Sequence, residues 1–88
     1  MNQNDDKHFD PMIYDVMREL STQIVGRYSA WERQAATARE AKHWHEEWLR
    51  VRREAREVDP RSRSAIEAKT SELRETLRQL PIDSPALP

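Results

Sequence analysis

The fold is decided by residues 11–58, which read PMIYDVMRELSTQIVGRYSAWERQAATAREAKHWHEEWLRVRREAREV. Apolar side chains recur in this stretch every three or four residues, which places them on one face of an α-helix, and nothing alternates with the period of two that a strand requires. The members of this apolar stripe are Ile13, Met17, Leu20, Ile24, Tyr28, Trp31, Ala35, Ala38, Ala41, Trp44, Trp48, Val51, Ala55 and Val58. The sequence therefore predicts an all-α fold.

Two Asp-Pro pairs divide the chain. Asp10-Pro11 is typical of a helix start, because the aspartate caps free backbone N–H groups and a proline in the first helical position loses no hydrogen bond. Asp59-Pro60 repeats this pattern and should end the preceding helix near residue 57 or 58. We therefore expect a flexible acidic arm over residues 1–10, a helical domain over residues 11–80 and a disordered, proline-rich tail over residues 81–88.

Gly26 is the only glycine of the chain and the one candidate break within residues 11–57. A glycine inside a helix costs only about 1 kcal/mol relative to alanine, and the apolar stripe passes through this position in phase. We therefore favour one continuous helix over residues 11–57, about 70 Å long. The alternative is a break at Gly26, where Ser29 and Glu32 have the spacing of a capping box.

A second helix is predicted over residues 60–80. Its own stripe is spaced by four, three, four and three residues and consists of Ile66, Thr70, Leu73, Leu77 and Leu80. The short corner at Asp59-Pro60 predicts an antiparallel helical hairpin with the end of the first helix. The predicted hairpin core is Trp44, Trp48, Val51, Ala55, Ile66, Leu73, Leu77 and Leu80.

This hairpin leaves the first part of the stripe without a cover, because the second helix reaches only to about residue 38. The uncovered side chains are predicted to bind a partner; they are Ile13, Met17, Leu20, Ile24, Tyr28 and Trp31. An exposed apolar patch of that size usually marks an interaction site. Three alternatives could bury these side chains. The chain could fold back at Gly26 to give a three-helix bundle, a second copy could pair with it in a homodimeric coiled coil, or another protein could bind the helix in a groove.

Composition limits the class of protein. The 88 residues are 35% charged and 36% hydrophobic, so they form one small domain with a thin core. There is no cysteine, and no apolar run approaches the roughly 20 residues of a membrane span. The first ten residues are acidic and polar, unlike a signal peptide. We therefore expect a cytoplasmic protein that does not enter a membrane.

The chain has one basic cluster, on the second half of the long predicted helix. Its candidate nucleic-acid contacts are Arg50, Arg52, Arg53 and Arg56. A nucleic-acid surface needs a positive face that no acid opposes. Here Arg50 and Arg53 each have a glutamate four residues away, which is typical of a solvated helix with ion pairs. Nucleic-acid binding therefore stays a minor alternative.

Catalytic and metal-binding patterns are weak. His43 and Glu47 have the four-residue spacing of two ligands on one helical face, but no HExxH motif and no third ligand accompany them. Trp44 and Trp48 have the same spacing and are interpreted as core. One glycine cannot build a phosphate loop. We therefore expect no enzymatic activity, no metal and no cofactor.

In general shape and composition across residues 11–80, the chain resembles the small all-helical antitoxins of bacterial toxin–antitoxin pairs, particularly those that neutralise zeta-type kinases or Fic-type transferases. Ser71 and Glu75 match part of the Fic-inhibitor pattern, although Thr76 stands where that pattern has Gly or Asn. The resemblance implies a non-enzymatic neutraliser that binds a partner protein through its N-terminal helix. The alternatives are a homodimeric coiled-coil adaptor and a nucleic-acid accessory protein.

Overall fold

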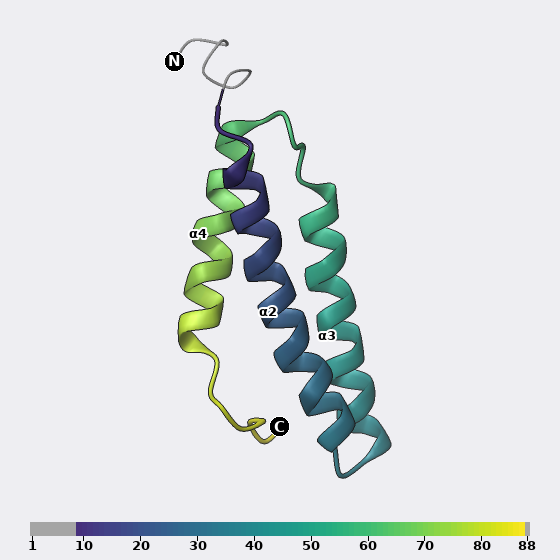
Figure 1. The fold of residues 1–88 in the computed structure, drawn as a ribbon. Helices are drawn as coiled ribbons and strands as arrows, with labels where there is room; N and C mark the ends of the chain where they lie inside the picture. The colour runs from purple at the N-terminus through teal and green to yellow at the C-terminus, as the bar shows by residue number, and fades with distance from the viewer. Residues whose placement is uncertain (1–8, 88) are drawn as a thin grey trace.

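A computed structural model describes residues 9–87. Within these residues the chain forms three helices, α2 (Met12–Gln34), α3 (Ala38–Glu57) and α4 (Arg63–Gln79). In Figure 1, α2 lies between α3 and α4, and it packs against both. The chain runs down α2, up α3 and down α4, so that α3 is antiparallel to its two neighbours. The bundle is elongated, with extents of 51 × 20 × 20 Å. The predicted all-α class is confirmed, in its three-helix form.

The prediction of one continuous helix over residues 11–57 is wrong. The helix breaks at residues 35–37, where Ala35 and Thr37 have extended backbone angles. The Thr37 hydroxyl accepts a hydrogen bond from the Glu40 N–H at 3.1 Å, and the Glu40 carboxylate accepts one from the Ala36 N–H at 3.4 Å. This arrangement is close to a capping box, in which the side chains of a Thr-x-x-Glu sequence satisfy the free N–H groups of a new helix.

Gly26 is not a break, although it was the only candidate on the basis of backbone flexibility. It lies in the middle of α2, is exposed and has no positive φ angle. Nothing lies within 4 Å of where its Cβ would be. Ser29 and Glu32 belong to the same helix, so they do not form the alternative capping box.

The other helix ends lie close to their predicted positions. The Asp10 carboxylate accepts a hydrogen bond from the Met12 N–H at 2.9 Å, where α2 begins. Helix α3 ends at Glu57, as predicted from Asp59-Pro60. Helix α4 begins three residues later than predicted, because Ser62 caps it by accepting a hydrogen bond from the Ala65 N–H at 3.2 Å.

The core is formed mainly by the apolar stripe. The buried hydrophobic side chains are Met17, Ile24, Tyr28, Trp31, Trp44, Val51, Ala55, Ile66 and Leu73. At the end near the α2–α3 turn, three aromatic rings pack together: the Trp44 centroid lies 4.7 Å from that of Trp31 and 5.4 Å from that of Tyr28. Ring pairs in this range add to the stabilisation that comes from burial alone.

Helix α4 does not form the predicted hairpin with α3 alone, because its main packing partner is α2. Its link to α3 is partly ionic: the Lys69 ammonium lies 3.1 Å from the Glu54 carboxylate of α3 and 2.7 Å from Glu72 of α4. The hydrogen bond from Lys69 lowers the pKa of Glu54, partial burial opposes this, and a hydrogen bond from Arg50 adds to the lowering.

The segment after α4 belongs to the tail expected to be disordered; residues 81–87 are described and contact α2, and residue 88 lies outside the described residues. The Arg27 guanidinium donates a hydrogen bond to the Pro81 carbonyl at 2.7 Å, and the Trp31 indole N–H lies 3.4 Å from the Ile82 carbonyl. Leu87 packs against the core. Figure 1 shows this segment leaving α4 and passing toward the lower end of the bundle. Since α2 extends beyond the end of α4, the segment completes the cover of Trp31. Of the predicted arm, residues 1–8 lie outside the described residues, and Phe9 packs against the core.

The position of the break can be tested by two single substitutions. Gly26→Ala should raise the free energy of unfolding by up to about 1 kcal/mol, because the site is helical and open. Thr37→Ala should lower it by about 1 kcal/mol, because the N-terminal cap of α3 is lost. Urea unfolding followed by circular dichroism measures both changes. A destabilising Gly26→Ala together with a neutral Thr37→Ala would place the break at Gly26 instead.

Candidate functional site

The side chains predicted to bind a partner lie mostly inside the bundle. Met17 and Ile24 are completely buried, Tyr28 and Trp31 are buried, and Ile13 and Leu20 pack half-buried against the core. The premise that they lack a cover within the chain is wrong, because the break at residues 35–37 folds α3 onto α2 and the corner at residues 58–62 places α4 beside it. A partner of the closed bundle cannot reach the four buried side chains.

The predicted hairpin core is in the core of the bundle, although its members do not form a separate hairpin. Trp44, Val51, Ala55, Ile66 and Leu73 are buried. Trp48, Leu77 and Leu80 are half-buried and pack against them. These side chains therefore serve packing, which leaves the exposed faces of the helices for any function.

A second row of apolar side chains lies on the outer face of α2. Met12 is 57% exposed and Val16 is 37% exposed, and Leu20 continues the row at the same four-residue spacing. Asp15, Glu19 and Gln23 share a shallow hollow with them. We call these six residues the α2 outer strip. It joins large exposed apolar groups to two carboxylates and contains no basic residue.

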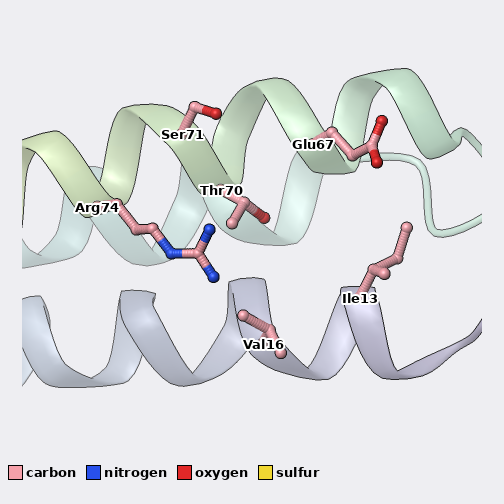
Figure 2. A pocket seen from close by; sticks show the side chains of 6 residues that line it. All are labelled: Ile13, Val16, Glu67, Thr70, Ser71 and Arg74. Atoms are coloured by element: carbon pink, nitrogen blue, oxygen red, sulfur yellow. The ribbon is translucent and has the colours of Figure 1, made fainter.

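The strip is continuous with a hollow of about 400 Å³ between α2 and α4, since Val16 lines both. The α2/α4 hollow is lined by Ile13, Val16, Glu67, Thr70, Ser71 and Arg74. Figure 2 shows Ile13 pointing from α2 toward α4 and the Arg74 guanidinium reaching from α4 toward α2, whereas Ser71 points away from α2. The Thr70 hydroxyl donates to the Ile66 carbonyl at 2.8 Å and is therefore already satisfied. The two adjoining hollows form a surface of mixed chemistry with an apolar centre.

His43, the candidate metal ligand, has an aromatic neighbour in the structure. Within residues 9–87, no group of three His, Cys, Asp or Glu side chains is placed to hold a metal ion. His43 instead packs edge-on against the Trp44 ring, with centroids 4.5 Å apart.

A cluster of polar side chains connects α2 and α3 near the turn at residues 35–37. The Glu32 carboxylate accepts a hydrogen bond from the Trp48 indole N–H at 2.6 Å and lies 3.2 Å from His45 Nδ1. The indole hydrogen bond lowers the pKa of Glu32; partial desolvation opposes this, and His45 adds to the lowering. This cluster is a structural contact between helices, because all three groups are engaged with one another.

The four arginines proposed as nucleic-acid contacts separate into two pairs. Arg50 lies 3.1 Å from both Glu47 and Glu54, and Arg53 lies 4.0 Å from Glu57. Arg52 stacks over the Trp48 ring at 5.7 Å from its centroid. Arg52 and Arg56 face a hollow between α2 and α3 and have no carboxylate partner in the described part of the chain. The four therefore do not form a single unopposed positive face.

The chain was compared with protein-family models, curated proteins and solved structures. None of the three comparisons finds a match. Within the described residues, no helix is long and apolar enough to cross a membrane. A function for the chain must therefore be argued from its exposed surfaces.

The residues that form these surfaces were not predicted from the sequence. Met12 and Val16 lie off the main stripe, and only their spacing of four and then another four to Leu20 indicates a second apolar row. Arg18 and Ser21 belong to the hollow between α2 and α3, and their part in it depends on α3 folding back. No local signal in the sequence pairs them with Arg52 and Arg56.

Glu32→Gln is expected to destabilise the fold and to reduce its pH dependence. Because the folded state lowers the pKa of Glu32, this carboxylate contributes stability above the ordinary glutamate value of 4.5, and the contribution is lost as the pH falls through the lower folded value. The difference in unfolding free energy between wild type and variant should therefore shrink below about pH 5. Denaturation series across the acid range measure it. Trp48→Phe, which removes the indole donor, should reduce the pH dependence of stability in the same range. If the difference in unfolding free energy between wild type and Glu32→Gln did not change in acid, the stabilising role of the Glu32 carboxylate would be contradicted.

Proposed function

We propose that the protein is a non-enzymatic interaction module that binds a basic amphipathic helix of a partner protein on the α2 outer strip. The observation that carries this proposal is the exposure of Met12 and Val16 beside Asp15 and Glu19 in one hollowed surface. Exposed apolar side chains in a row along a helix are typical of sites that take a second helix.

The size of the strip suits one helix. From Met12 to Gln23 it extends about 17 Å along α2, or three turns. A partner helix of similar length would place one apolar side chain between Met12 and Val16 and another between Val16 and Leu20. The α2/α4 hollow extends this binding surface and supplies Ile13 as a further apolar contact.

The negative charges of the α2 outer strip favour a partner helix with basic residues. Asp15 and Glu19 flank the apolar row, and no ion pair within residues 9–87 engages either of them. A helix with lysine or arginine on both sides of its apolar face would pair with these carboxylates, which favours fast association and correct register. An acidic helix would place like charges together and would be disfavoured.

A second copy of the chain fits this strip poorly. In a two-fold dimer the same patch faces itself, so Asp15 and Glu19 would meet the same carboxylates of the other copy. The closed bundle also removes the reason for expecting a dimer, because the apolar stripe is covered within the chain. We therefore place the homodimeric adaptor second.

The resemblance to small antitoxins gives this proposal a narrower form, in which the partner is a toxin and the protein is its cytoplasmic neutraliser. The support for it is the common size, charge content and helical architecture. The binding surface would differ from the one expected from the sequence: the outer face of α2 would contact the toxin, while Met17, Ile24, Tyr28 and Trp31 hold the neutraliser together.

The proposal can be tested with two designed helical peptides of about 18 residues that share one leucine face and carry either lysine or glutamate on the flanks. Fluorescence anisotropy should detect binding of the lysine peptide, with affinity falling as salt rises, and much weaker binding of the glutamate peptide. Val16→Asp should weaken binding of the lysine peptide about tenfold or more, because it places a charge in the apolar centre.

The matched control is Leu49→Asp, the same kind of change at a similarly exposed apolar side chain of α3, 42% exposed against 37% for Val16. It should change the affinity by less than about twofold. Equal effects of the two substitutions, equal binding of both peptides, or no binding of the lysine peptide would each overturn the proposal.

A further inference from the structure

A second surface of the bundle has the opposite chemistry. Residues of α2 and α3 line a hollow of about 300 Å³ that contains three arginines, two hydroxyl groups and two small or medium apolar side chains. We call it the basic hollow. Its lining residues are Arg18, Ser21, Thr22, Val25, Arg52, Ala55 and Arg56.

Helix geometry brings the three arginines together. Arg52 and Arg56 are four residues apart, so they lie on one face of α3, and the antiparallel packing of α2 places Arg18 opposite them. Ala55 lies between the helices, and its short side chain leaves depth where a longer one would fill the space.

In the described part of the chain, no carboxylate neutralises this group of charges. Among residues 9–87, Arg18, Arg52 and Arg56 take part in no ion pair, in contrast to Arg50 on the other side of α3. Arg18 lies over the Tyr14 ring at 6.0 Å, and Arg52 lies over the Trp48 ring at 5.7 Å. Such stacking holds a guanidinium in place without using its N–H donors, which stay available to an anion.

A buried hydroxyl without a partner lines the same hollow. Ser21 is only 4% exposed, and its side chain has no hydrogen bond to any described residue. Its neighbour Thr22, in contrast, donates to the Arg18 carbonyl at 3.0 Å. A buried hydroxyl usually has a hydrogen-bond partner, so an unpaired one beside three free guanidiniums indicates that the partner comes from a ligand.

We propose that the basic hollow binds a phosphate group. A phosphate dianion has enough acceptor oxygens for several guanidiniums and for the Ser21 hydroxyl at once, and arginine pairs with it through two parallel hydrogen bonds. A single carboxylate would leave part of this donor set unused. The volume of the hollow exceeds that of one phosphate, which leaves room for the first atoms of an ester.

The hollow favours one phosphate over an extended nucleic-acid backbone. The other two arginines of the basic cluster on α3 are Arg50 and Arg53, and glutamates engage both. A nucleic-acid strand would therefore bind strongly at the basic hollow, but its neighbouring phosphates would face arginines that are already paired with glutamates. This proposal is independent of the partner helix, because the basic hollow and the α2 outer strip share no residue.

Inorganic phosphate is the first probe, and amide chemical shifts of labelled protein are the readout. Titration to about 10 mM should move the signals of Ser21, Thr22 and Ala55 with one common affinity. Arg56→Gln should weaken this binding at least fivefold, whereas Arg53→Gln, the same change three residues away on the same helix, should weaken it less than twofold. Ser21→Ala should weaken it while the protein stays folded.

Further probes distinguish the sources of the phosphate. Glycerol phosphate should bind at least as well as inorganic phosphate, and acetate should bind much more weakly. A single-stranded oligonucleotide of about ten residues and vesicles that contain phosphatidic acid should bind no more tightly than the simple ester. Much tighter oligonucleotide binding that depends equally on Arg53 and Arg56 would overturn the single-phosphate site in favour of a nucleic-acid surface. An absence of shifts with phosphate, or equal effects of Arg53→Gln and Arg56→Gln, would overturn it as well.

Discussion

The structure depends on the capped reversal of the chain at residues 35–37. Thr37 and Glu40 satisfy free N–H groups at this point, which lets a new helix begin immediately after the last one ends. The reversal places Trp44 against Trp31, and the apolar stripe closes on itself. Without it, the first half of the stripe would face water, and α4 would have to cover α3 alone. This one turn determines which helices lie side by side, and therefore which side chains are buried in the core and which are exposed.

The sequence predicted the helical class, the part of the core that α3 and α4 contribute and most of the helix ends, because these depend on local patterns. Spacing of three and four identified Trp44, Val51 and Leu73 as buried, and Asp59-Pro60 located the end of α3. The break at residues 35–37 was not predicted, because no glycine or proline stands there and the apolar stripe passes through in phase. A helix cap is a weaker signal in sequence than a glycine or proline, since Thr-x-x-Glu also occurs inside helices. In this chain, tertiary packing decides that Thr37 starts a new helix.

The exposed sites could not be predicted for a related reason. Whether a side chain on α2 is covered depends on which helix lies beside it, and the predicted continuous helix gave α4 the wrong neighbour. Ser21 illustrates this: along the chain it is an ordinary helical serine, and only the approach of α3 makes it a buried hydroxyl beside Arg52 and Arg56. The acidic α2 outer strip and the basic hollow are therefore products of the tertiary fold, and they give two faces of α2 opposite charge.

Helices α2 and α3 should fold back on each other in solution, and a distance between two labels tests this most directly. The chain has no cysteine, so spin labels can be attached through cysteines introduced at Glu19 and Arg53, both of which are exposed. Two adjacent helices of about 10 Å diameter place these labels within roughly 30 Å of each other, whereas one continuous helix separates the positions by about 50 Å. Pulsed electron paramagnetic resonance should give a single narrow distribution at the short distance. A distribution centred near 50 Å would contradict the closed bundle and the surfaces derived from it.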